Sequence, residues 1–211
     1  MDAADDALHS DADISINDGG STIATGDDGV QAEATVTIAG GGLTISNSYE
    51  GLEAATMVIS GGTSEVTSTN DGVHISDGSS RSGGMGATTI GLLTISGGSL
   101  TVDTGGDGLD SNGSARMSGG TVIVNGPTRD DNGPLDVNGT FGISGGTLLA
   151  LGSAAMAQAP TDGSAPEISV GVEYAIEANG VAVASQANQA TGSSVPGGRL
   201  GGPGGPGRPR G

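Results

Sequence analysis

Residues 27–48 read DDGVQAEATVTIAGGGLTISNS, and this segment contains one full copy of a repeat that recurs along the chain. It holds three spaced apolar positions, Val30, Ile38 and Ile45, with a glycine-rich corner after the second. Around Ile38, apolar and polar residues alternate as V-T-I, which is the period-two pattern of a β-strand. Glycine at a corner can adopt the positive φ that a sharp turn needs. The segment therefore predicts short strands joined by tight corners.

The three apolar positions recur as columns along the first 150 residues. Most steps between turns are 21 or 22 residues, and two longer steps of 36 and 26 residues carry insertions between Val73 and Leu93 and around 125–134. The columns are Leu8, Val30, Leu52, Val73, Leu109 and Leu135; Ile16, Ile38, Ile59, Ile95, Met117 and Ile143; and Ile23, Ile45, Val66, Val102, Val124 and Ala150. Insertions confined to corners are typical of a solenoid, in which each turn stacks on its neighbours.

Three short strands in each turn of about 22 residues predict an all-β chain, a parallel β-helix of about six turns over residues 1–150. Helical repeats of about 34 or 40 residues do not fit this period, and a leucine-rich repeat would need a helical face between its strands. We expect 151–195 to form a C-terminal cap or irregular β segment with strands at 168–170 and 180–183. The stretch 196–211 is rich in Gly, Pro and Arg and is expected to be a disordered tail.

The composition excludes several classes of function. The chain has 24 acidic residues, six arginines and no lysine, and a formal charge of −18, which disfavours binding to nucleic acid or to anionic membranes. No apolar stretch is long enough for membrane insertion, and no signal peptide is present. Because the repeat begins with the first residues, we expect an extracellular or cell-surface protein whose native N-terminus and signal have been trimmed. Cysteine is absent, which excludes disulfides and thiolate metal sites.

Acidic residues also recur with the repeat. In a parallel β-helix, equivalent positions lie one above another, so the pattern predicts a carboxylate column just before the first strand of each turn: Asp6, Asp28, Glu50, Asp71 and Asp107. A neighbouring column holds Asp5, Asp27 and Asn70, and a third is expected to hold Asp11, Glu33, Glu53, Asp110 and Asp136. Two carboxylates one strand spacing apart (~4.8 Å) repel by about 3.5 kcal/mol at an effective dielectric constant of 20. Such a column needs a counter-ion.

Calcium fits this need, because Ca²⁺ binds six to eight oxygens from carboxylates, carbonyls and water, and Asp-Gly corners offer both kinds of protein oxygen. The predicted ligands are Asp6, Asp27, Asp28, Glu33, Glu50, Glu53, Asp71, Asp107 and Asp110. A solvated acidic face, as in proteins adapted to high salt, would show the same composition without a specific metal site. The sequence leaves these two readings open.

Several motifs together resemble a known family. They are the repeated D-D-G-[LV], Y-E-G-L-E at 49–53, the I-S-G-G-[TS] corners at 59–63, 95–99 and 143–147, and M-A-Q-A-P at 156–160. The stretch from about 5 to 160 resembles carbohydrate-binding-domain proteins with a right-handed parallel β-helix similar to pectate lyases. This resemblance implies calcium at the acidic turns, at Asp27, Asp28, Glu50 and Asp71, and binding of acidic sugars such as polygalacturonate. After 160 the chain departs from the family pattern.

The sequence thus predicts a non-catalytic protein that binds acidic polysaccharide through Ca²⁺, with Tyr49 and Arg129 as further sugar-binding residues. Tyr49 is the only aromatic residue near the column, which disfavours neutral glycans held on aromatic platforms. One alternative is an adhesin or filament-type solenoid stabilised by calcium, with end-to-end self-association through open strand edges. Another is a pectate-lyase-like enzyme that uses Arg129, Arg81 or Arg116 as its base. His9 and His74 occupy similar positions and are expected to face solvent.

Overall fold

The computed structural model describes most of the repeat region and parts of the C-terminal segment. The described residues are 2–76, 90–153, 156, 158–163, 168–171, 176–178 and 181–183. Most of the first predicted insertion, including Arg81, and the predicted tail at 196–211 lie outside the described residues.

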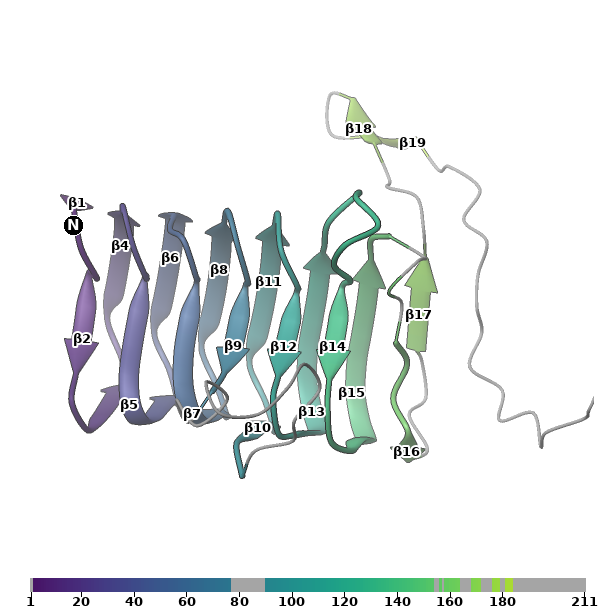
Figure 1. Cartoon of the computed structure of the whole chain (residues 1–211), viewed down its shortest axis with the longest axis horizontal. Helices are drawn as coiled ribbons and strands as arrows, with labels where there is room; N and C mark the ends of the chain where they lie inside the picture. Colours follow the sequence, from purple (N-terminus) through teal and green to yellow (C-terminus); the bar gives the residue numbers. More distant parts are fainter. Residues whose placement is uncertain are drawn as a thin grey trace, which may run out of the picture.

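The chain is a right-handed parallel β-helix, and its turns stack side by side along a rod (Figure 1). The described residues contain strands and no helix. The strands of the six turns are β2 (Leu8–Ser10), β3 (Asp13–Ile16) and β4 (Gly20–Thr25); β5 (Val30–Ile38) and β6 (Gly42–Asn47); β7 (Leu52–Ile59) and β8 (Thr63–Ser68); β9 (Val73–Ile75), β10 (Leu92–Ile95) and β11 (Ser99–Thr104); β12 (Leu109–Ser111) and β13 (Ser114–Asn125); and β14 (Leu135–Val137) and β15 (Phe141–Leu151). A short strand, β1 (Asp2–Ala3), pairs with β4 at the N-terminal end.

The register of the strands confirms all three apolar columns. Leu8 pairs with Val30 and Val30 with Leu52 in the first column, and the second and third columns continue in the same way to Ile143 and Ala150. These side chains point inward and form one continuous core; Val30, Leu52 and their equivalents in later turns are completely buried. Leu8 in the first turn is only partly buried, because no turn of this chain covers it from the N-terminal side.

The glycine corners are confirmed as well. The second glycine of each corner has a φ between 77° and 91°, a backbone conformation that residues with a Cβ rarely adopt. A different demand acts at Gly51, where an added Cβ would lie 2.2 Å from Val66 Cγ1 and 2.3 Å from the Gly72 carbonyl oxygen. Glycine at this position lets the acidic corners pack directly on the core of the rod.

Stacking continues beyond Ala150. Strand β16 (Asp162–Gly163) and strand β17 (Ile168–Gly171) both pair in parallel with β15. Strand β19 (Val181–Val183) pairs antiparallel with β18 (Ile176–Ala178). Strands are therefore present at both places where the sequence predicts them after 160, but β17 extends the helical stack and does not pair with β19.

Candidate functional site

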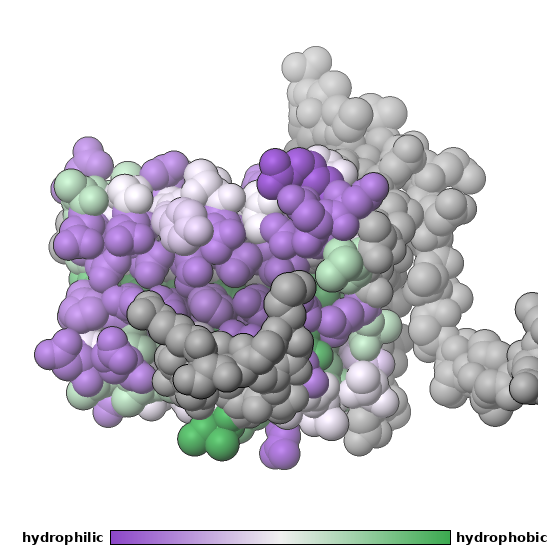
Figure 2. Space-filling model, viewed as in Figure 1, coloured by the Kyte–Doolittle hydropathy of each residue, from purple (hydrophilic) through white to green (hydrophobic). Residues whose placement is uncertain are grey.

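The acidic corners lie along one edge of the rod, where each turn enters its first strand. The main-chain bonds fix this alignment: the Gly29 N–H donates to the Glu50 carbonyl, the Gly51 N–H to the Asp71 carbonyl and the Gly72 N–H to the Asp107 carbonyl. The predicted carboxylate column of Asp6, Asp28, Glu50, Asp71 and Asp107 is thus formed, and we call it the acidic ladder. Figure 2 shows that hydrophilic residues cover much of the adjoining face, on which β9 and β12 lie.

The acidic ladder is tied into the backbone by its own side chains. Asp28 Oδ1 accepts a hydrogen bond from the Glu50 N–H at 3.0 Å, and Asp71 Oδ1 accepts one from the Asp107 N–H at 2.7 Å. Asp6 and Asp107 accept from the corresponding amides of the following turns at 3.1 and 2.6 Å. The carboxylate therefore supplies an acceptor to a backbone donor one turn away, and a charged acceptor makes this a strong bond. Each of these carboxylates keeps a second oxygen for another partner.

Glu50 breaks the pattern because its side chain is one methylene longer. Its carboxylate contacts His74, with Glu50 Oε2 at 2.7 Å from His74 Nδ1. The other nitrogen of His74, Nε2, lies 3.5 Å from Asp110 Oδ2, and Nδ1 lies 3.7 Å from Glu53 Oε1. Only 18% of the His74 side chain is exposed, so the expectation that it faces solvent is wrong. His74 is an internal counter-ion for three carboxylates.

A second polar column lies beside the ladder, on the outward side of the first strands. Its members are His9, Gln31, Glu53, His74, Asp110 and Asp136. The expected third acidic column is therefore wrong in part: Glu53 lies opposite Gln31 and not opposite Glu33. Two residues of the wider turn, between Ala32 and Thr35, have no counterpart in the next turn as a pair, and this register shift makes counting along the sequence misleading. His9 and His74 do share a column, but they are three turns apart.

Burial has a strong effect on protonation in this region. Burial raises the pKa of Asp110 to about 7 and that of Asp71 to about 6, in each case partly opposed by a favourable charge from His74. Burial also raises the pKa of Asp28, against the hydrogen bond from the Glu50 amide. For His74, burial alone would lower the pKa, but the hydrogen bond to Glu50 and the surrounding carboxylates raise it to about 9. At neutral pH His74 carries a charge, and the buried acids are held near their titration points.

Three groups of side chains bring candidate metal ligands within 4.8 Å of one another. One is the exposed group of Asp5, Asp6 and Asp27 at the N-terminal end. The second is the buried group of Asp28, Glu50 and Glu53, and the third joins Glu50 and Asp71 to His74. The first two offer only carboxylate oxygens, which are the ligands of Ca²⁺, whereas the charged imidazole of His74 competes with a cation in the third. We refer to the first two groups as the outer and inner carboxylate clusters.

The remaining predicted ligands lie outside these groups. Asp107 holds the Gly133 amide, and its pKa is raised by burial. Asp110 contacts His74. Glu33 is exposed and lines, with Glu53, a small pit of about 50 Å³.

The two predicted sugar-binding residues have different surroundings. Tyr49 is 51% exposed, adjoins Glu50 in the chain, and its N–H donates to the Asp27 carbonyl, so it stands between the two carboxylate clusters. Arg129 is exposed and its guanidinium lies 3.4 Å from Asp131. It is therefore already paired with an acidic neighbour. The role of His74 was not evident from the sequence, although its alternation with Glu53 and Asp110 in one column was a signal of contact.

Comparison with known proteins gives no relative for this chain: no family model, curated protein or solved structure matches it. The described residues include no helix of the length and apolar character that a membrane span requires. The arguments about function therefore rest on the chemistry of the acidic edge.

Proposed function

We propose that this protein is a non-catalytic, extracellular carbohydrate-binding β-helix that holds Ca²⁺ on its acidic edge and binds acidic polysaccharide through that metal. The observation that carries the proposal is the pair of carboxylate clusters, each with three ligand oxygens within 4.8 Å. No lysine or arginine forms a salt bridge with either cluster among the described residues. A divalent cation is the natural partner for such an arrangement.

The geometry favours calcium over magnesium. Asp6 and Asp28 each use one oxygen for a backbone amide, so the second oxygen is available to a metal without loss of the corner. Ca²⁺ accepts irregular sets of six to eight oxygens at 2.3–2.6 Å, whereas Mg²⁺ demands a nearly ideal octahedron. Three carboxylates fixed by a β-helix leave several positions of a calcium ion for water or for a ligand.

Those open positions suit the carboxylates of a uronic-acid polymer. The protein itself is strongly acidic, so an acidic sugar can approach this edge only when a cation neutralises both partners. Tyr49, exposed between the clusters, offers an apolar face on which a sugar ring can stack. Repeated corners match the repeated charge of such a polymer.

A non-catalytic role is proposed because no base is placed beside the clusters. Arg129 is paired with Asp131, and the protonated His74 cannot accept a proton. Arg116 lies on the middle strand of its turn, away from the corners. A lyase would need an unprotonated base next to the metal-bound sugar.

A second candidate function is a structural solenoid stabilised by calcium, such as an adhesin or filament segment. It is favoured by the carboxylate-to-amide bonds, which show that the ladder also serves the fold itself. Under this hypothesis calcium would stabilise the rod but would not increase its affinity for a sugar.

Titration calorimetry with soluble galacturonate oligomers separates these functions. Wild-type protein should bind the oligomers much more tightly in Ca²⁺ than in EDTA or Mg²⁺. The double variant Asp27→Asn/Glu53→Gln, which removes one carboxylate from each cluster, should lose this gain. Glu65→Gln is the matched control, because Glu65 is an exposed acid on β8, outside both clusters. Equal binding of the oligomers with and without Ca²⁺ would refute the proposal.

A further inference from the structure

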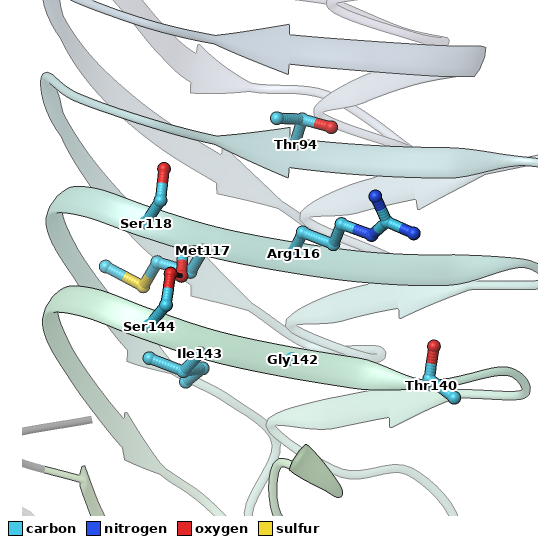
Figure 3. A pocket seen from close by; sticks show the side chains of 8 residues that line it. All are labelled: Thr94, Arg116, Met117, Ser118, Thr140, Gly142, Ile143 and Ser144. Atoms are coloured by element: carbon cyan, nitrogen blue, oxygen red, sulfur yellow. Dashed lines mark hydrogen bonds between the residues drawn. The ribbon is translucent and has the colours of Figure 1, made fainter. Parts of the chain in front are cut away.

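A groove unrelated to the acidic edge lies on the face formed by β10, β13 and β15 (Figure 3). Its volume is about 460 Å³, within the range of ~300–1,000 Å³ typical of small-molecule sites. It is lined mainly by one cation and by hydroxyl groups, contributed by Thr94, Arg116, Ser118, Thr140 and Ser144. No acidic residue lines it, which is unusual for a chain with 24 acids.

The register of the strands explains the hollow. Thr94 pairs with Arg116, and Arg116 with Gly142, so these three residues form one outward-facing column. Gly142 has no side chain, and the space beside the long Arg116 side chain therefore stays open (Figure 3). A glycine inside a strand often marks a place where a ligand can approach the backbone closely.

The Arg116 guanidinium is free to bind a ligand. No described residue forms a salt bridge or a hydrogen bond with it, whereas Arg129 is paired with Asp131. A guanidinium presents a planar fork of N–H donors that matches a carboxylate with two parallel hydrogen bonds. Arg116 is exposed, so keeping it unpaired carries little energetic cost.

The hydroxyls complete the chemistry of the groove. Within the part of the chain that the structure describes, the hydroxyls of Thr94 and Ser118 have no hydrogen-bond partner. The Thr140 hydroxyl donates weakly to Ser114 Oγ at 3.4 Å, and that of Ser144 to the Met117 carbonyl at 3.5 Å. A ligand with both a carboxylate and several hydroxyls would satisfy these groups together.

We propose that the groove is a second, metal-independent subsite that binds a carboxylate-bearing sugar unit through Arg116. This inference rests on the proposed function, because it assigns to the same class of polymer a contact away from the calcium edge. A neutral sugar would leave the guanidinium unused, and a simple inorganic anion would leave the hydroxyls unused.

The test uses trigalacturonate and its methyl ester, titrated into the full chain in EDTA at low ionic strength. We expect wild-type protein to bind trigalacturonate weakly and the ester not at all. Arg116→Gln should weaken binding at least about tenfold, since hydrogen bonds between charged groups contribute about 1.5–3 kcal/mol. Arg129→Gln should bind like wild type. Arg116→Lys keeps the charge but not the fork, and should have intermediate affinity.

Three results would overturn the inference: no binding by wild type in EDTA, unchanged binding by Arg116→Gln, or equal binding of the ester. Arg116→Gln should keep the wild-type melting temperature, which shows that lost binding is not lost folding. The same variant should retain the gain in affinity that Ca²⁺ produces. Failure of the proposed function would remove that Ca²⁺-dependent gain, whereas failure of this inference would leave the gain intact and abolish only the Arg116 effect in EDTA.

Discussion

Replacing His74 with glutamine tests the electrostatic account of the acidic edge. His74 is the only described cation that contacts the buried carboxylates of the ladder, through Glu50 at 2.7 Å and Asp110 at 3.5 Å. Glutamine retains hydrogen-bonding capacity but carries no charge. The substitution therefore leaves the same carboxylates close together with no compensating charge, and the folded state should be destabilised.

The pKa of His74 gives the magnitude. A rise from 6.5 to about 9 corresponds to about 3 kcal/mol, at about 1.4 kcal/mol for each pKa unit. Because the folded-state pKa is the higher one, this stabilisation is complete below pH 6.5 and disappears as the pH rises through 9. In EDTA, His74→Gln should lower the free energy of unfolding by about 3 kcal/mol at pH 6, by about 2 kcal/mol at pH 7.5, and by under about 1 kcal/mol at pH 9.

The assay is urea-induced unfolding followed by circular dichroism at these three pH values, with His9→Gln as the control. His9 occupies the same column, but its side chain is 44% exposed, so its loss should have little effect. A loss of stability that is the same at pH 6 and pH 9 would refute the reasoning, because it would reflect packing and not charge. Equal losses in the two variants would refute it as well.

Three further predictions concern the ladder and the corners. In EDTA the melting temperature should fall as the pH rises from 5 to 8, because the pKa values of Asp71 and Asp110 are raised to about 6 and about 7 and their stabilising protons are lost over this range; saturating Ca²⁺ should reduce this fall, and a flat profile in EDTA would contradict the burial of these acids. Asp107→Ala should destabilise the protein by about 1–3 kcal/mol by leaving the Gly133 amide without its acceptor, while Asp107→Asn keeps an acceptor; chemical unfolding that gives equal stability for the two would exclude the hydrogen-bond role. Gly51→Ala should cost about 1–3 kcal/mol or more in thermal unfolding because its Cβ would lie 2.2 Å from Val66, whereas Gly42→Ala, with open space around it, should be mild; similar effects at both positions would contradict the packing described for the corner.

The fold was predictable because its determinants are local and repeated. Each inward column consists of Val, Ile or Leu at one spacing, and each corner carries a glycine that the φ values show to be needed. The six turns follow from these two signals alone. Even the groove has a trace in the sequence, because aligning the residues before Met117 and Ile143 places Arg116 beside Gly142.

The site was only partly predictable. The ladder of Asp6, Asp28 and Asp71 follows from the repeat, but the column assigned to Glu33 and Glu53 was wrong because a register shift lies between them. The partnership of His74 with Glu50 depends on the reach of the longer glutamate side chain across two turns, and sequence spacing does not reveal side-chain direction. The amide-accepting role of the aspartates was missed for the same reason.

The central claim is that the acidic edge binds Ca²⁺ specifically and that this calcium binds acidic sugar. Thermal unfolding in EDTA, Ca²⁺, Mg²⁺ and NaCl of matched ionic strength, and then in Ca²⁺ with galacturonate oligomers, tests it most directly. A ligand that binds only the folded state stabilises it in proportion to the logarithm of its concentration over its dissociation constant. We predict a rise in melting temperature that grows with Ca²⁺, that NaCl does not reproduce, and that increases again with the oligomer. An equal rise in NaCl would contradict the claim and would identify the ladder as a solvated, purely structural edge.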